Sequence, residues 1–188
     1  LTYIPFKHLG YKAAMVNLSD IYAMGGSPKQ MTVSVALSKR FGIEDMEDFY
    51  AGLRLACEAH GVDIIGGDTT SSRTGLAISI TAIGEVEKGA AIYRNGAKET
   101  DLICVSGDLG AAYMGLQLLE REKDVYYKQI ETAKTDIERM AISQPDFSGR
   151  EYLLERQMKP EARRDILEQL RQAGIRPTAM IDISDGLS

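Results

Sequence analysis

The sequence has little of the residues on which several common kinds of protein chemistry depend. Its two cysteines, Cys57 and Cys104, are isolated, so we expect no disulfides and a reducing compartment, the cytoplasm. The two histidines, His8 and His60, have no ligand partner at metal spacing, which disfavours zinc and gives no support to Ser/His/Asp catalysis. No apolar run approaches the ~20 residues of a membrane helix, so a membrane is not an expected partner.

The sequence also has only a small excess of charge of one sign. The 22 basic and 27 acidic residues give a net charge of −5 without a basic stripe, so nucleic acid is not an expected partner. A Walker loop is absent, which excludes a P-loop nucleotide site on this stretch. Hydrophobic residues at 44% and charged residues at 26% are close to the average of folded soluble proteins, which excludes disorder, collagen and coiled coil.

The pattern of apolar residues and glycine stops predicts an α/β (α+β) protein with mixed sheets packed with helices. We expect helices over residues 6–24, 44–60, 111–120 and 161–173, with residues 121–143 helical or a surface insertion. We expect strands over residues 30–38, 62–65, 76–86, 102–105 and 178–183. A polar, glycine-bearing link at 88–95 predicts a domain boundary, with domains over residues 1–90 and 91–188.

The two ends of the sequence are unusual. Leu1 is not a methionine, and Ser188 follows Asp185-Gly186-Leu187, which is typical of the opening of a helix. We therefore expect the chain to be an internal piece of a longer protein.

Four aspartates lie at the ends of predicted elements: Asp20, Asp68, Asp182 and Asp185. A single aspartate at such a place is more often an N-cap or turn residue than a ligand. Here three separate element ends carry one beside glycine, serine or threonine. Mg²⁺ prefers one or two carboxylates together with waters and phosphate oxygens, so the pattern favours Mg²⁺ ions that bridge a nucleotide.

Other residues are weaker candidates for phosphate or nucleotide contacts. Gly67 allows close approach of backbone amides to a phosphate, and Arg94 could bind one bidentately, although a solvated surface arginine is equally expected. Tyr50 lies on an apolar helix face, where core packing is the alternative. The stretch Gly107-Asp108-Leu109-Gly110 suits either a helix N-terminal phosphate site or a tight turn that needs glycines.

Three motifs in this order resemble the thiamine-monophosphate kinases, members of the aminoimidazole-ribonucleotide-synthetase-like superfamily. They are Val16-Asn17-Leu18-Ser19-Asp20 followed by Met24-Gly25 and Pro28, then Gly66-Gly67-Asp68-Thr69-Thr70, then Ile181-Asp182-Ile183-Ser184-Asp185-Gly186-Leu187. The resemblance covers nearly the whole chain, with residues 121–143 the least similar. It implies the two-domain fold of that superfamily and a homodimer that pairs N-terminal sheets.

The resemblance also implies roles for the matching residues. Asp20, Asp68, Asp182 and Asp185 would bind Mg²⁺, and ATP would be held by Tyr50, Gly67, Asp68, Arg94 and Ser184. The implied reaction transfers a phosphoryl group from ATP to thiamine monophosphate, giving thiamine diphosphate. Because the acceptor oxygen is already anionic, no catalytic base is expected, and metal-bound carboxylates would neutralise charge.

Two family features are not found in the sequence: an N-terminal Gly-Asp-Asp motif with a histidine-bearing substrate loop, and a C-terminal substrate-binding region. We therefore expect the chain to be the central portion of the enzyme, with much of the ATP site and little of the thiamine site. The alternatives are another ATP-dependent enzyme of the superfamily, of the hydrogenase-maturation type, or a non-catalytic nucleotide- or metal-binding assembly domain. The Gly-Gly-Asp-Thr motif does not exclude the first of these.

Overall fold

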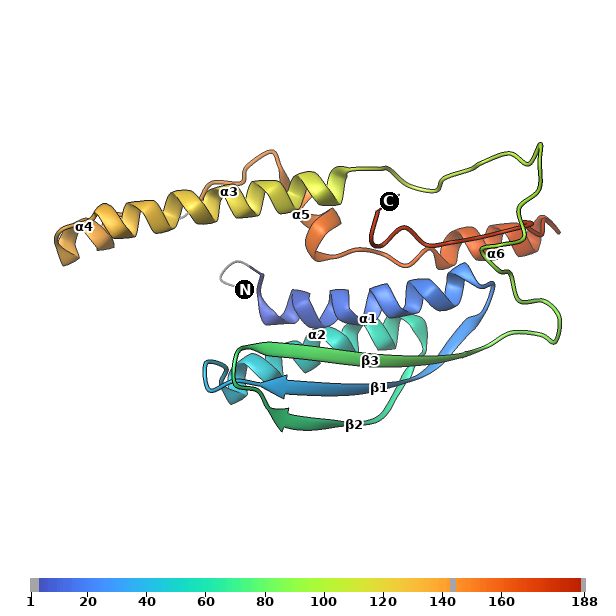
Figure 1. The fold of residues 1–188 in the computed structure, drawn as a ribbon, viewed down its shortest axis with the longest axis horizontal. Coiled ribbons are helices and arrows are strands. Elements are labelled where there is room, and N and C mark those ends of the chain that lie inside the picture. Colours follow the sequence, from blue (N-terminus) through green and yellow to red (C-terminus); the bar gives the residue numbers. More distant parts are fainter. Residues whose placement is uncertain (1–3, 143–144, 187–188) are drawn as a thin grey trace. The chain divides into compact units, whose positions relative to one another are not determined.

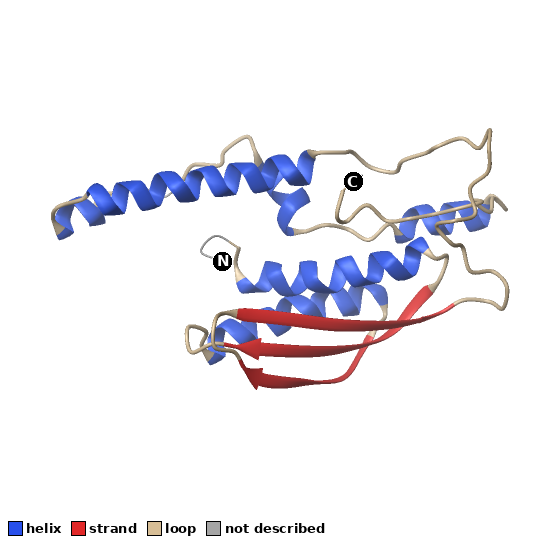
Figure 2. Ribbon diagram, in the orientation of Figure 1, coloured by secondary structure: helices blue, strands red, loops and turns tan. Residues whose placement is uncertain are grey.

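A computed structural model describes residues 4–142 and 145–186. The chain forms two compact units. The sheet unit contains Phe6–Ser106 and the chain from Glu161 onward, and the helical unit is built from Gly107–Pro160. Figure 1 follows the chain through both units, and Figure 2 shows their helices and strands. The expected α/β (α+β) class, a mixed sheet packed with helices, is confirmed. The boundary near residue 90 stays a prediction.

Two helices cover one face of the sheet in the sheet unit (Figure 1). They are α1 (Phe6–Ala23) and α2 (Ile43–His60), close to the predicted spans. The helix α2 ends at Gly61 in the left-handed conformation, as the sequence predicts. The side chains of Met15, Leu18, Phe49 and Leu53 are fully buried between the helices and the sheet. This apolar layer is the main core of the molecule.

The sheet has three strands in the order β2-β1-β3. The strand β1 (Ser27–Leu37) pairs in parallel with β2 (Asp63–Ser71) and antiparallel with β3 (Leu76–Glu85). The parallel pair is connected through α2, as parallel strands require a crossover. Alternation along β1 buries Val33 and Val35 under the helices and leaves Ser34 exposed on the opposite, outer face of the sheet.

The Gly-Gly-Asp-Thr-Thr stretch does not form the turn that the sequence predicted after residue 65. It lies inside β2, where Gly66 to Thr70 pair with Thr32 to Ala36 of β1, after a bulge at Ile65. A Cβ atom on Gly67 would collide with the carbonyl oxygen of Val33, so the absent side chain is what lets β2 continue this close to β1.

The C-terminal part of the sheet unit begins with α6 (Arg164–Gln172), which lies within the predicted helix 161–173. Leu167 and Ala162 are buried in the core beside α1, and the Tyr11 hydroxyl donates to Glu161 Oε1 at 2.6 Å. The segments 102–105 and 178–183, predicted as strands, are not strands in the described chain. Their apolar residues suit a sheet, but a strand needs a partner ladder, and Ile103 is 102% exposed.

The helical unit contains α3 (Ala111–Thr132), α4 (Asp136–Met140) and α5 (Glu151–Met158). The helix α3 continues beyond residue 120 to Thr132, and with α4 it makes much of residues 121–142 helical, which was one of the two alternatives for that segment, whereas α5 was not predicted. Before α3, Gly107 and Gly110 have φ values of 87° and 88°, and Asp108 accepts from the Tyr152 hydroxyl at 2.7 Å. The turn that needs glycines, one of the two alternatives for this stretch, is therefore present.

The sequence predicted neither a membrane helix nor a disulfide. Among the described residues, no helix is both long and apolar enough to cross a bilayer. Cys57 and Cys104 are free thiols, and burial and then the charge of Glu58 raise the pKa of the Cys57 thiol to about 11. The cytoplasm as compartment stays a prediction.

Candidate functional site

Four of the predicted site residues come together in the sheet unit. Asp20 lies near the end of α1, and the charges of Asp182, Asp185 and Arg94 all act on its carboxyl group. These residues come from three separate segments: a helix, the loop after β3 and the irregular C-terminal segment. The first and third motifs of the sequence therefore meet in space.

The Asp20 carboxyl group is held in an environment that disfavours its charge. Partial burial raises its pKa, and the neighbouring carboxylate of Asp182 raises the pKa further. Asp185 acts in the same direction, and the positive charge of Arg94 opposes them. A second cation at this position would relieve the remaining repulsion between the carboxylates.

The C-terminal motif is arranged by its own short hydrogen bonds. The Ser184 hydroxyl donates to Asp182 Oδ2 at 2.6 Å, and the amide of Gly186 donates to the Ile183 carbonyl at 3.1 Å. This turn places Asp182, Ser184 and Asp185 within one tight segment. The last residue of the motif, Leu187, lies outside the described residues.

The loop that carries Arg94 is anchored just before this residue. The Ile92 amide donates to the Met24 carbonyl at 3.0 Å, and its side chain is buried near Gly25, directly after α1. Arg176 Nη2 donates to the Gly89 carbonyl at 2.8 Å. Arg94 itself follows both anchors and is exposed, so its guanidinium is available to an anion.

The second motif lies elsewhere in the sheet unit. Asp68 pairs in register with Ser34 and shares the exposed outer face of the sheet, whereas Asp20 belongs to the helix layer on the other face. Its Oδ1 accepts the amide of Thr69 at 2.9 Å. The structure therefore divides the four predicted aspartates into one group of three and a separate Asp68.

Tyr50 is half-buried on α2. Its ring packs edge to face against Phe49, with centroids 5.4 Å apart, and against the main core. Core packing, the alternative left open by the sequence, describes the position of this side chain. Its role as an ATP contact stays a prediction, as does that of Gly67, whose missing side chain already has a packing reason.

The carboxylates of Asp20, Asp182 and Asp185 suit Mg²⁺ if waters and phosphate oxygens supply its other ligands. In the described part of the chain, no three His, Cys, Asp or Glu side chains converge closely enough to hold a metal ion by themselves. Mg²⁺ does not need such a cage, since it uses one or two carboxylates and takes waters and phosphate oxygens for the rest. The contact between Asp20 and Asp182 and the unfavourable charge at Asp20 fit an ion of this kind.

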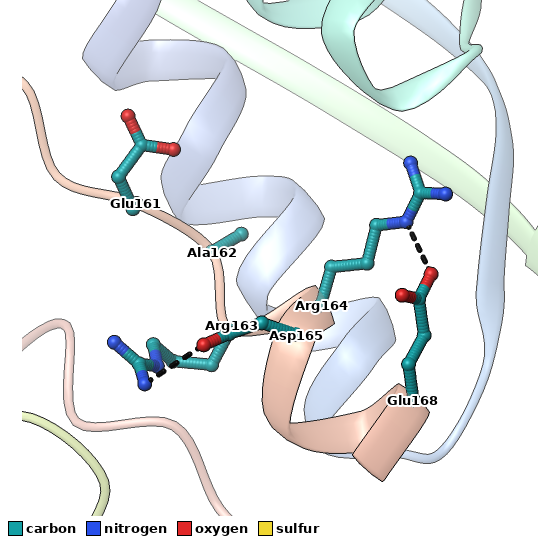
Figure 3. A pocket seen from close by; sticks show the side chains of 6 residues that line it. All are labelled: Glu161, Ala162, Arg163, Arg164, Asp165 and Glu168. Atoms are coloured by element: carbon teal, nitrogen blue, oxygen red, sulfur yellow. Dashed lines mark hydrogen bonds and ion pairs between the residues drawn. The ribbon is translucent and has the colours of Figure 1, made fainter. Parts of the chain in front are cut away.

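A hollow elsewhere in the sheet unit has no part in this group. It is lined by the start of α6 and the residues before it (Figure 3): Glu161, Ala162, Arg163, Arg164, Asp165 and Glu168. Two ion pairs lie among these residues, Arg163 to Asp165 at 3.0 Å and Arg164 to Glu168 at 2.7 Å. Its charged side chains are largely neutralised by one another, and none of the predicted site residues lines it.

The residues that join the segments of the site were not among those predicted from the sequence. Asp101 Oδ2 accepts from the Thr178 hydroxyl at 2.6 Å and from the Lys98 amide at 2.8 Å. The contact with the Lys98 amide closes a local turn for which aspartate is well suited, so the sequence around Asp101 could have indicated it. The contact with the Thr178 hydroxyl joins residues far apart in the sequence, so no local pattern predicts it.

Comparisons with known proteins agree with the resemblance seen in the motifs. Residues 2–86 match the family "AIR synthase related protein, N-terminal domain". The thiamine-monophosphate kinase of Bacillus subtilis (strain 168) is 34% identical over 188 residues, which are 100% of this chain and 52% of that protein. The chain thus spans about half the length of the curated relatives it matches.

Solved structures of the same kind superpose on the chain. The crystal structure of thiamine monophosphate kinase from Aquifex aeolicus does so with a TM-score of 0.75 at 31% identity, covering 100% of this chain and 55% of that one. The structure of AaThiL complexed with AMPPCP and TMP has a TM-score of 0.70 at 30% identity, covering 92% and 48%. The chain therefore covers about half of each of these two structures.

Proposed function

This chain is a relative of the thiamine-monophosphate kinases, and from that premise we propose that it serves in the ATP-dependent phosphorylation of thiamine monophosphate to thiamine diphosphate. The observation that carries the proposal is the meeting of Asp20 with Asp182, Asp185 and Arg94. Carboxylates and a guanidinium at one place suit a metal–nucleotide complex. The structure of a relative complexed with AMPPCP and TMP supports the same substrates.

The proposed chemistry needs neutralisation and orientation of charge rather than a base. The acceptor is a phosphate oxygen that is anionic at neutral pH, which agrees with a site that contains neither histidine nor cysteine. When bound, Mg²⁺ would offset the negative charge of the phosphates and draw them together. Asp20 and Asp182 would bind one such ion directly, with the charge of Asp185 beside it and phosphate oxygens and waters as the other ligands, and Asp68 on the outer face of the sheet would bind another.

The remaining proposed contacts orient the nucleotide. Arg94 would bind phosphate oxygens through its planar guanidinium, and the Ser184 hydroxyl would be shared between Asp182 and the nucleotide. Gly67 and Tyr50 complete the proposed ATP contacts, Tyr50 through the exposed part of a ring whose other side packs on the core.

The test uses the full-length protein with Mg²⁺ and ATP. Formation of thiamine diphosphate from thiamine monophosphate, with release of ADP in equal amount, is the expected result. Other phosphorylated acceptors serve as controls and should give at most a small fraction of the rate. ATP consumption that does not depend on thiamine monophosphate would favour an enzyme of the hydrogenase-maturation type. Nucleotide binding without any turnover would favour a non-catalytic domain, and either result would overturn the proposal.

We also propose a homodimer formed through the outer face of the sheet. This face carries short side chains such as Ser34, Ser79 and Thr81, and Ile83 is 45% exposed on it. Small residues allow close approach of a second sheet. Sedimentation should give a dimer at micromolar concentration. Thr81→Lys should shift it towards monomer and Thr74→Lys, in the β2–β3 loop, should not; a monomeric unmodified protein would contradict the proposal.

A further inference from the structure

The loop that carries Arg94 ends in a strained turn. Thr100 has a φ of 75°, and it is the one non-glycine residue with a positive φ in residues 4–142 and 145–186. A β-branched residue in this region is unfavourable, because its side chain crowds the backbone. Such a conformation persists only where the surrounding contacts hold it.

The contacts that hold it belong to Asp101. Its Oδ2 accepts the Lys98 amide at 2.8 Å, which closes the turn around Thr100, and the Thr178 hydroxyl at 2.6 Å. Both hydrogen bonds, that of Thr178 first, lower the pKa of Asp101, so the carboxylate stays ionised near neutral pH. Asp101 therefore fixes the loop to a residue of the C-terminal segment.

A second contact reinforces the first at the same place. A Cβ atom on Gly96 would collide with the carbonyl oxygen of Thr178, so the loop lies directly against that backbone. Gly96 is two residues from Arg94, and Thr178 precedes Asp182 in the same irregular segment. The loop and the segment that supply Arg94 and Asp182 are thus joined beside the site, but not by residues of the site.

We propose that Asp101 and Thr178 form a clamp that positions Arg94 beside Asp20 and Asp182 and thereby sets the affinity for ATP. The inference rests on the proposed function, because that function supplies the ATP phosphate that Arg94 would bind. Asp101 and Thr178 are positioning residues, since their polar atoms are used by each other and by the Lys98 amide. Arg94 would otherwise sample many positions, and binding would have to order it.

The test compares variants of the full-length protein that differ only at the clamp. Thr178→Val keeps the shape of the side chain and removes the hydroxyl, whereas Thr178→Ser keeps the hydroxyl. Asp124→Ala, at an exposed position on α3, is the control for Asp101→Ala. Calorimetry with Mg-ATP should show binding weakened about tenfold in Thr178→Val and Asp101→Ala. Thr178→Ser and Asp124→Ala should stay within about twofold of the unmodified protein.

A double-mutant cycle separates positioning from general damage. In an Arg94→Ala background, Thr178→Val should weaken ATP binding by less than about twofold, because the residue that it positions is gone. An undiminished tenfold effect in that background would overturn the clamp. The steady-state counterpart is a raised KM for ATP with kcat changed by less than about threefold.

A measurement without nucleotide keeps the clamp testable if the kinase proposal fails. The backbone amides of Arg94 and Gly96 should have ¹⁵N order parameters of about 0.85 in the unmodified protein and below about 0.6 in Thr178→Val. Thr178→Ser should restore the higher values. Equal order parameters in all three proteins would overturn the clamp, whereas absence of ATP binding with the expected change in order would overturn only the proposed function.

Discussion

The carboxyl group of Asp182 lies close enough to that of Asp20 to raise the pKa of Asp20, although one residue lies on the first helix and the other near the C-terminal end of the described chain. Two carboxylates in such contact repel unless a proton or a cation lies between them. The fold tolerates this because α6 and the segment after it are fixed independently: Leu167 is buried in the core, and Arg171 Nη2 donates to the Gly25 carbonyl at 2.7 Å. Packing elsewhere thus maintains an unfavourable charge arrangement at the site.

The first prediction concerns Asp20→Asn. The folded protein raises the pKa of Asp20, so the ionised carboxylate destabilises the fold once the pH exceeds that raised value, and stability is highest below the ordinary value. An amide removes the charge and donates to Asp182. In Mg²⁺-free buffer at pH 7.5 the variant should melt about 1–2 °C higher than the unmodified protein.

The same substitution should lower activity. Kinase turnover of Asp20→Asn should fall by at least about 100-fold, because a proposed metal ligand is lost. Leu18→Ala, two residues earlier on the same helix and buried in the core, is the opposite control, since it should lower the melting temperature. A drop in melting temperature for Asp20→Asn in the absence of Mg²⁺ would contradict the repulsion between the two carboxylates.

A second prediction concerns Asp68 and distinguishes its role in the site from its contribution to the stability of β2. Asp68→Asn should reduce kinase turnover by orders of magnitude, about 100-fold or more, with a melting temperature within about 2 °C of the unmodified protein. The side chain is on the outer face of the sheet and its local bond to the Thr69 amide can be made by an asparagine oxygen. Asp63→Asn, at the exposed start of the same strand, should leave both quantities unchanged. Unaltered turnover and Mg-ATP affinity in Asp68→Asn would remove this residue from the site.

The elements predicted correctly from the sequence are those defined by local signals. The apolar spacing of α2 and the left-handed Gly61 that ends it lie within one segment, and so does the alternation of β1 around Val33 and Val35. Segments 102–105 and 178–183 carry an equally good apolar signal and are not strands. A strand depends on a partner ladder, which the sequence of the segment does not contain.

The site shows the same division between local and long-range information. The motifs around Asp20 and Asp182 predict acidic ends of elements, but their meeting depends on how α6 docks, through Leu167 and Arg171. The Gly-Gly-Asp motif suggested a turn because glycine has two uses, freedom of φ and absence of volume. At Gly67 the missing volume against Val33 decides the structure, and only the paired strand reveals that.

A third prediction follows from this packing. Gly67→Ala should lower the free energy of unfolding by about 2–4 kcal/mol, because the new Cβ atom meets the Val33 carbonyl and one of the two strands must move. Gly66→Ala is the matched control: its φ of 155° is close to that of Gly67 at 158°, but no atom lies within 4 Å of the added carbon. It should cost about 1–2 kcal/mol. Equal losses in urea unfolding of the two variants would show that the close approach of β2 to β1 is not the cause.

The last prediction concerns His60, whose Nδ1 hydrogen-bonds to the Tyr22 hydroxyl at 2.8 Å across α1 and α2. Burial lowers the pKa of His60, the nearby positive charge of Arg164 lowers it further, and Glu161 opposes them. The unfolded chain therefore takes up a proton at a higher pH than the folded protein does. Stability is fully present above the ordinary pKa of about 6.5 and is lost as the pH falls from there through the lowered value.

Between pH 7.5 and 5.5 the unmodified protein should lose about 1–2 °C of melting temperature more than His60→Gln, which has no imidazole to protonate. The effect is small because the ring is only partly buried and solvent screens part of the charge. Glu58→Gln, in the last turn of the same helix, should keep the pH slope of the unmodified protein, since it leaves the imidazole of His60 and its contact with Tyr22 in place. If His60→Gln loses stability with the same slope as the unmodified protein, the contact between Tyr22 and His60 is indifferent to protonation, and the packing of α2 on α1 does not depend on a neutral ring.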